Sequence, residues 1–150
     1  MQTLTVTKII PAPPGDVFEA YIDHEKLANV PGVRSCALAR EGDTEKNGTG
    51  AIRELDCGAL WLREEITGLD RPHRVEYRIR KSKPASRHEY GQVDFIEVPG
   101  GTKVTWTTKF GALSAAGPVM DPLFAVLFGV AFRLVLRDVG RRAVAAGRTR

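Results

Sequence analysis

The sequence predicts a single α+β domain spanning residues 1–150, in which a curved seven-stranded antiparallel sheet wraps around one long C-terminal helix. Three observations predict this fold. Apolar residues recur with a period of two between residues 33 and 110, turn residues interrupt that region at short intervals, and a long apolar stretch of helical character follows it. Because a strongly twisted sheet and a straight helix cannot touch everywhere, we expect an internal cavity between them.

The first strand and two short helices precede the main run of strands. Leu4, Val6 and Ile10 alternate with threonines, which predicts a strand with one apolar face. A pair of prolines then favours the start of a short amphipathic helix, whose apolar residues are Val17, Phe18, Tyr21 and Ile22. A second short helix is expected around residues 24–30, and it ends before Pro31.

Six further strands are predicted between residues 33 and 110, separated by turn signals at Gly42, Asn47–Gly48, Gly58, Pro72, near Pro84 and at Pro99–Gly101. After a linker from Gly111 to Pro118, Asp121 and Pro122 are expected to form the N-cap and first-turn pair of a helix that runs to about Ala146. The first half of this helix is apolar nearly all round, so it must cover the apolar face of the sheet.

The composition fits one globular domain that needs neither disulfides nor metal for stability. A chain of 150 residues can bury a substantial core. Its two cysteines, Cys36 and Cys57, lie in separate strand-like segments and do not make a disulfide framework. The N-terminal residues lack the cationic and apolar blocks of a signal peptide, so reduced thiols and a cytoplasmic location are expected.

Several classes of partner and cofactor are disfavoured. The net charge is +4, but Lys and Arg are interleaved with Asp and Glu through the strands, so no nucleic-acid partner is expected. The longest apolar run, Pro122 to Phe132, is shorter than the ~18 residues of a transmembrane segment. The histidines and cysteines lack the spacing of metal ligands, and no phosphate or dinucleotide loop is present. We therefore expect no metal and no cofactor, in a monomer or a homodimer.

Strand alternation predicts which large side chains face the cavity. Leu62 falls on the inward face of the segment after Gly58, and the two clearest later strands turn Tyr77 and Trp106 inward. Phe128 of the long helix is expected on the opposite wall. These four residues are the predicted apolar walls of a ligand pocket.

Three charged residues fall on the same apolar faces. Glu64 lies between Leu62 and Ile66, while Arg53 and Arg34 each share a face with apolar neighbours in their own segments. Isolated buried charges are costly and are usually paired. The charges are either a buried Arg–Glu ion pair that fixes the sheet, or strand-end groups that reach water, or polar groups that orient a ligand.

Alternation leaves the face of the segment from Ser86 to Val98 undecided. One face holds His88, Tyr90, Gln92, Asp94 and Ile96, and the other holds Arg87, Glu89, Gly91, Val93 and Phe95. A histidine in this setting is more often a rim or hydrogen-bonded core residue than a catalytic base.

Several segments, taken in order, resemble the START-like superfamily, also called SRPBCC, with its birch-pollen-allergen and polyketide cyclase/dehydrase members. The strongest match is Ile9–Pro13 followed by Asp16–Phe18 and Asp23, and further matches are Gly50–Leu55, Glu64–Ile66 with Leu69–Asp70, and Gly101–Trp106. The resemblance covers nearly the whole chain. It implies a single START-like domain with the helix-grip fold and an internal cavity for hydrophobic ligands, including lipids.

The plant hormone receptors of this superfamily suggest further roles. By this resemblance Arg34 stands where an inward lysine meets the ligand carboxylate, Glu64 resembles an inward glutamate, and Tyr77 resembles a pocket aromatic. Tyr90 and Gln92 resemble a pair of pocket polar residues, which favours the even face of residues 86–98. The turns at residues 58–60 and 81–86 would flank the cavity mouth. Trp106 replaces an acidic residue, and the receptors' gate and latch sequences are not matched, so hormone sensing is not implied.

Two functions remain open at this point. In the first, the protein binds an aromatic or polyketide-like molecule and catalyses its cyclisation or dehydration, with Arg53, Arg34 or Tyr90 polarising a carbonyl while Glu64 or His88 moves a proton. In the second, the same residues only anchor the ligand of a non-catalytic carrier or sensor of a lipid or hydrophobic metabolite. A third and weaker alternative is a peripheral membrane or protein-binding module that uses the apolar helix and its basic end.

Overall fold

The structure is a computed structural model that describes residues 1–112 and 117–150. Its elements in chain order are β1 (Gln2–Ile10), α1 (Pro14–Ile22), the 3-10 helix η1 (His24–Asn29), β2 (Ser35–Arg40), β3 (Ile52–Asp56), β4 (Trp61–Asp70), β5 (Arg74–Lys83), β6 (Ser86–Val98), β7 (Gly101–Ala112) and α2 (Gly117–Arg148). The predicted order of one strand, two short helices, six strands and a long helix is confirmed.

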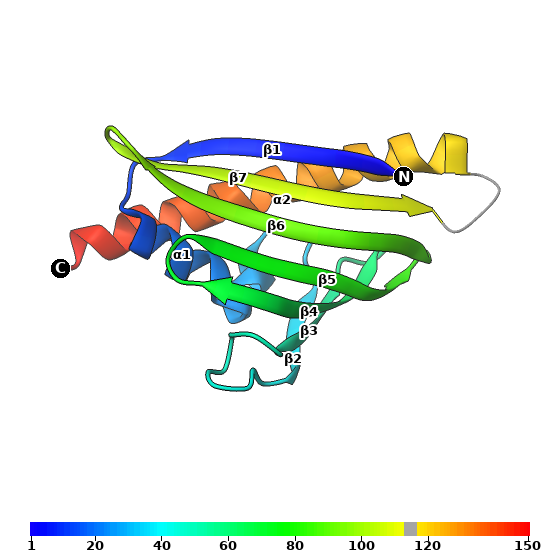
Figure 1. The fold of residues 1–150 in the computed structure, drawn as a ribbon, viewed down its shortest axis with the longest axis horizontal. Helices are drawn as coiled ribbons and strands as arrows, with labels where there is room; N and C mark the ends of the chain where they lie inside the picture. The colour runs from blue at the N-terminus through cyan, green and yellow to red at the C-terminus, as the bar shows by residue number, and fades with distance from the viewer. Residues whose placement is uncertain (113–116) are drawn as a thin grey trace.

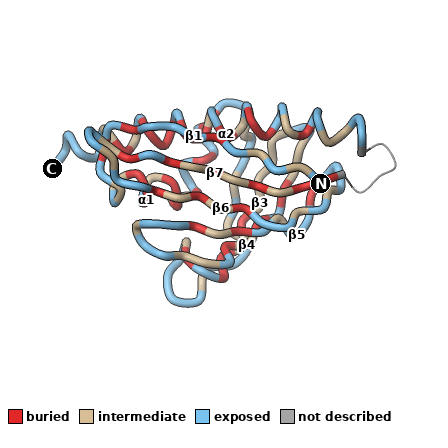
Figure 2. The backbone as a smooth tube through the Cα atoms, turned by 45° about the horizontal axis from the view of Figure 1, so that its top comes forward, coloured by how far each residue is buried: buried red, intermediate tan, exposed pale blue. Residues whose placement is uncertain are grey.

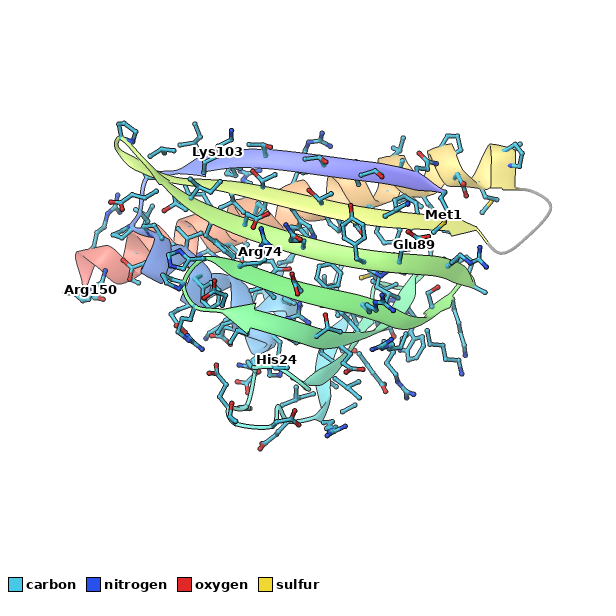
Figure 3. All side chains as sticks on the ribbon, viewed as in Figure 1. Met1, His24, Arg74, Glu89, Lys103 and Arg150 are labelled. Carbon is cyan, nitrogen blue, oxygen red and sulfur yellow. The ribbon has the colours of Figure 1, made fainter. Side chains whose placement is uncertain are left out.

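All seven strands form one antiparallel sheet in the order β1-β7-β6-β5-β4-β3-β2. Figure 1 shows the sheet curving in front of α2 and α1, which both lie against its other side. The convex face carries exposed polar side chains, among them Arg74, Glu89 and Lys103 in Figure 3. The chain therefore has the predicted helix-grip architecture, with its core between the sheet and α2.

One side of α2 is buried from Phe124 to Ala143 and the other side is not, as Figure 2 shows by alternating colours. The buried side chains include Phe124, Phe128, Phe132, Leu136 and Val139. They recur at helical spacing and pack on the inner face of the sheet, which is the pattern of an amphipathic core helix. Although α2 is long and apolar enough to cross a membrane by composition, it is a core helix of this fold and not a span.

The predicted start of α2 is wrong. The helix begins at Gly117, so Pro122 lies inside it and Asp121 is not its N-cap. Pro118 can occupy the first turn, where a missing N–H costs nothing, and Pro122 then lacks only the N–H that would reach back to residue 118. Asp121 instead approaches the N-terminal ammonium of Met1, at 3.7 Å. Of the predicted linker, residues 113–116 lie outside the described part of the chain.

The face of β6 changes along its length because the strand contains a β-bulge. His88 pairs with Phe110 and Tyr90 pairs with Lys109, so β6 advances two residues while β7 advances one. Such an extra residue reverses which side chains face the core. Beyond the bulge, the inward residues are Gly91, Val93 and Phe95, and the even face favoured from the sequence is wrong for that half of the strand.

Candidate functional site

A cavity of about 480 Å³ lies between α2 and the inner face of the sheet. Leu62 of β4, Tyr77 of β5 and Trp106 of β7 line one side, and Phe128 of α2 lines the other. All four are buried, as strand alternation and helical spacing predicted. The wall is almost entirely apolar, and its size is in the range of small-molecule sites.

Arg53 and Glu64 are the charged residues in this wall. They are direct partners across β3 and β4, and alternation on the two strands turns both inward. Glu64 Oε1 accepts hydrogen bonds from Arg53 Nε at 2.8 Å and from Nη2 at 2.5 Å. Arg53 is 5% exposed and Glu64 is 7% exposed. Burial opposes the charge of Arg53, but the attraction and hydrogen bonds of Glu64, together with the attraction of Tyr21, outweigh burial and raise the pKa of the guanidinium. Arg53 is thus a charged group inside an apolar wall.

The ion pair leaves hydrogen-bonding capacity unused. Both of its hydrogen bonds end on Glu64 Oε1, and none of the described residues donates a hydrogen bond to Oε2. Arg53 Nη1 is likewise not used in the pair. An acceptor and a donor therefore remain for a polar group that enters the cavity.

Tyr21 of α1 adds a polar group that the sequence analysis did not assign to the site. It lines the cavity and is 3% exposed, and its hydroxyl has no hydrogen-bond partner among the described residues. Burial raises its pKa, Tyr77 and Glu64 add to the rise, and the nearby Arg53 opposes it. The hydroxyl therefore stays protonated and can donate. The only signal in the sequence was one phenol among the apolar residues of an amphipathic helix.

The side chains of Tyr77 and Trp106 are hydrogen-bonded to each other in the wall of the cavity. The indole Nε1–H of Trp106 donates to the Tyr77 hydroxyl at 2.7 Å. Burial raises the pKa of Tyr77, and Glu64 adds to the rise. Trp106 also stacks on Phe132 of α2, with ring centroids 3.8 Å apart. Because the indole N–H is already satisfied within the protein, Trp106 offers a ligand only an apolar surface.

His88 does not line the cavity. Its Nδ1 accepts the backbone N–H of Ile79 at 3.0 Å, so the proton is assigned to Nε2, which lies 2.7 Å from Thr108 Oγ1. The pairing of β5 with β6 runs only from Arg74 to Tyr77, and the ring of His88 takes up the N–H of Ile79 beyond that point. Burial lowers the pKa of His88 to about 4, and Arg78 contributes. His88 is therefore neutral, and its two hydrogen bonds connect β6 with β5 and with β7.

Tyr90, Gln92 and Arg34 also lie outside the cavity. Tyr90 is exposed, and Gln92 donates to Asp94 Oδ2 at 2.8 Å on the convex side of the sheet. Both follow the bulge in β6, which turns them away from α2. Arg34 precedes β2 and is exposed, with its guanidinium beside Gly58. Of the alternatives left open above, the strand-end position describes Arg34 and the buried ion pair describes Arg53 with Glu64.

The mouth of the cavity is framed by both turns that were expected to flank it. Ala59 and Leu60 come from the turn after β3, and Pro84 comes from the turn after β5. Leu123 and Leu127 of α2 belong to the same wall and are also about half exposed to solvent. The cavity therefore opens beside the outer face of α2.

A metal-based site has no support in the described residues, because no three His, Cys, Asp or Glu side chains there are grouped closely enough to hold an ion. Arg53 and Tyr21 are donors and Glu64 is an acceptor, set together in an otherwise apolar wall. They can hold and polarise one oxygen-bearing group of a hydrophobic molecule.

The fold is similar to several solved structures. TTHA0849 from Thermus thermophilus aligns with a TM-score of 0.76 and 21% identity, over 97% of this chain and 99% of that one. Ara h 8.0201 aligns with a TM-score of 0.72 and 15% identity, over 96% and 98% of the two chains. Major latex-like protein 151 from Panax ginseng aligns with a TM-score of 0.68 and 20% identity, over 95% and 97%. At such low identities the likeness shows the shared fold.

The sequence itself matches a protein family. No curated protein matches it significantly. The family described as polyketide cyclase / dehydrase and lipid transport matches residues 1–144, which is most of the chain. Membership implies that the cavity binds a hydrophobic ligand, in agreement with its apolar wall. Together with the helix-grip fold, this match shows that the chain belongs to the polyketide cyclase / dehydrase and lipid transport family.

Proposed function

We propose that the protein binds a small aromatic or polyketide-like molecule that is mostly apolar and carries one polar oxygen group. The observation that carries this proposal is the ion pair of Arg53 and Glu64, which is the charged part of an otherwise apolar wall. Burying two charges in an apolar wall costs free energy, and a hydrophobic pair of similar volume would fill the same space without that cost. The orientation of a ligand is a function that would require two charged residues at these positions.

The ligand's polar group is proposed to lie against Arg53, Glu64 and Tyr21. Arg53 Nη1 and the Tyr21 hydroxyl supply donors, and Glu64 Oε2 supplies an acceptor. The buried, unpartnered hydroxyl of Tyr21 supports this position, because a ligand oxygen would satisfy it. The rest of the ligand would lie against Leu62, the rings of Tyr77 and Trp106, and α2. Binding without turnover is the function that this geometry supports best, since His88, one of the two residues expected to move a proton, has both ring nitrogens engaged elsewhere.

A matched pair of probes tests the proposal. 2-Acetylnaphthalene and 2-isopropenylnaphthalene have nearly the same shape, but only the first carries a carbonyl oxygen. Each is used to displace the fluorescent probe 8-anilino-1-naphthalenesulfonate. We expect the ketone to bind about tenfold more tightly to the wild type, because hydrogen bonds to charged groups contribute about 1.5–3 kcal/mol.

Three variants complete this experiment. Tyr21→Phe should keep its affinity for the hydrocarbon and lose several-fold in affinity for the ketone. Ala131→Trp, which fills the cavity from α2, should weaken both. Tyr90→Phe, which removes an exposed hydroxyl outside the cavity, is the control and should change neither. Equal binding of the two probes by the wild type, or failure of Ala131→Trp to weaken either, would contradict the proposal.

Catalysis of cyclisation or dehydration is a second candidate, favoured by the unused oxygen of Glu64. Arg53 would polarise a ligand carbonyl while Oε2 removes a proton from the adjacent carbon. The resulting enolate would attack a second carbonyl, and the protonated adduct would lose water. We expect Glu64→Gln to abolish ring formation from a poly-β-carbonyl chain, followed by the absorbance of the aromatic product. If the wild type forms that product no faster than buffer, this second candidate is lost.

Two predictions from the sequence stay open. The cytoplasmic location is supported by the free thiols of Cys36 and Cys57. The oligomeric state is still either a monomer or a homodimer.

A further inference from the structure

The solvent-facing side of α2 carries a continuous stripe of side chains that changes character halfway along the helix. Its first half is apolar, and the exposed residues there, between 48% and 74% exposed, are Val119, Leu123, Val126, Leu127 and Val130. Its second half is cationic, with exposed Arg133, Arg137, Arg141 and Arg148. Steps of three and four residues keep both halves on one helix face, so we call this surface the α2 stripe.

The apolar half of the α2 stripe is unusual for a face turned to water. Contiguous exposed apolar patches on a monomer mark sites of interaction. Leu123, Leu127 and Val130 also belong to the wall of the cavity, so the patch is continuous with the cavity mouth. A hydrophobic molecule could therefore pass between the cavity and whatever covers the patch without crossing bulk water.

The cationic half indicates the charge of the partner. Arg133 and Arg137 have no ion-pair partner among the described residues, and the two acidic residues of α2 do not belong to the exposed stripe. Asp138 is buried and held by Arg141 and Arg142. Beside this half of the helix, a groove of about 450 Å³ against β1 adds Lys8 to three of the arginines. The partner must be anionic here and apolar along the first half.

A second copy of the chain fits this surface poorly. If two α2 helices packed in opposite directions, the arginines of each would lie over the apolar half of the other. If they packed in the same direction, arginines would face arginines. Neither arrangement supplies a negative charge, whereas the interface of an anionic bilayer presents acyl chains and phosphates within one side-chain length of each other.

From this pattern we infer that the α2 stripe docks on the surface of an anionic lipid bilayer. The helix lies at the interface, with the apolar half inserted among the acyl chains and the arginine half against the headgroup phosphates, and the cavity mouth opens toward the lipid. The inference is independent of the ligand proposed above, since it concerns the surface beside the mouth and not the polar group in the wall.

Vesicle co-sedimentation tests this inference. The wild type is mixed with vesicles of phosphatidylcholine alone and with vesicles of equimolar phosphatidylcholine and phosphatidylglycerol, at low and at high salt. We expect binding to the anionic vesicles, much weaker binding to the neutral ones, and release by salt. Each arginine near an anionic surface contributes about a fivefold gain in affinity, so Arg133→Glu combined with Arg137→Glu should reduce binding by about 25-fold or more.

Variants of the apolar half separate docking from ligand binding. Val119 and Val126 do not line the cavity, so Val119→Asp with Val126→Asp should abolish vesicle binding and leave the displacement of the naphthalene probes unchanged. Matched controls lie on the convex face of the sheet. Ile96→Asp changes an exposed apolar residue, and Arg78→Glu with Arg87→Glu changes exposed arginines. Both convex-face variants should bind anionic vesicles as tightly as the wild type does.

Three outcomes would overturn the inference. One is no binding of the wild type to anionic vesicles. Another is equal loss in the α2 and the convex-face variants, which would indicate binding by net charge alone. The last is a dimer in sedimentation velocity that the Val119→Asp and Val126→Asp variant dissociates, without vesicle binding by the wild type, which would make the stripe an interface between copies.

Discussion

The ring of Tyr77 lies directly over the backbone of Gly91, its partner across β5 and β6. A Cβ atom at Gly91 would stand 2.1 Å from Tyr77 Cζ, which is far inside van der Waals contact. Gly91 follows the bulge of β6 and faces inward, so its missing side chain is the space that the ring occupies. This contact fixes the aromatic ring that forms the floor of the cavity.

Gly91→Ala should therefore lower stability by about 1–3 kcal/mol, because added volume in a packed core forces its neighbours out of position. The free energy of unfolding in urea measures the effect. Gly15→Ala is the control, since nothing lies within 4 Å of a Cβ at that position. Combining Gly91→Ala with Tyr77→Leu should recover part of the loss. An unchanged free energy of unfolding in Gly91→Ala would mean that the ring is not held there.

Glu64→Gln should lower the free energy of unfolding by about 3–5 kcal/mol, because it leaves the buried guanidinium of Arg53 without its counter-charge. The double variant Arg53→Met with Glu64→Leu should recover most of that stability, since no buried charge remains. Glu54→Gln provides a matched control: Glu54 pairs with Arg63 across the same two strands on the exposed face, and its loss should cost less than about 1 kcal/mol. Equal costs at the two positions would show that the inner pair is not desolvated.

The depressed pKa of His88 gives folding stability a pH dependence between about 4 and 6.5. In that window the unfolded chain binds a proton that the folded protein does not, so stability falls as the pH is lowered. The His88 contribution lost on going from pH 7 to pH 4 is at most about 3 kcal/mol. Unfolding of the wild type and of His88→Gln across this range should show a smaller dependence in the variant. An NMR titration of His88 near its ordinary pKa would refute this account.

Tyr77→Phe should lower the free energy of unfolding by about 1–3 kcal/mol, because the buried indole N–H of Trp106 loses its acceptor. Thermal unfolding reports the change, and so does the emission of Trp106 in the folded state when Trp61 is replaced by Phe. The exposed Tyr90→Phe removes a hydroxyl from the same residue type and should leave stability within experimental error. If both variants unfold alike, the hydrogen bond contributes nothing measurable.

The part of the site that could be predicted from the sequence rests on local alternation. Arg53, Glu64, Leu62 and Trp106 stand in strands where several apolar neighbours share one parity, so their inward direction follows from period two alone. The inward direction of Phe128 follows in the same way from the period of the helix. Such patterns need no knowledge of which strands pair.

The residues whose positions differ from the sequence expectation depend on longer-range structure. Tyr90 and Gln92 turned outward because one extra residue in β6 changes its register against β7, and a bulge is a property of two strands together. Arg34 reached water because β2 begins one residue after it, where pairing with β3 sets in. Tyr21 joined the site because α1 docks beside the sheet.

The sequence by itself determined the order of the elements, the helix-grip fold and the buried charges of β3 and β4. The hydrophobic periodicity that predicts them depends only on residues that are close together in the chain. Only the tertiary structure decided that these charges meet across two strands, that Tyr21 completes their surroundings and that the cavity opens beside an exposed apolar stripe of α2. Those relations depend on strand register and helix docking, which bring together residues far apart in the chain and leave no periodic trace in it.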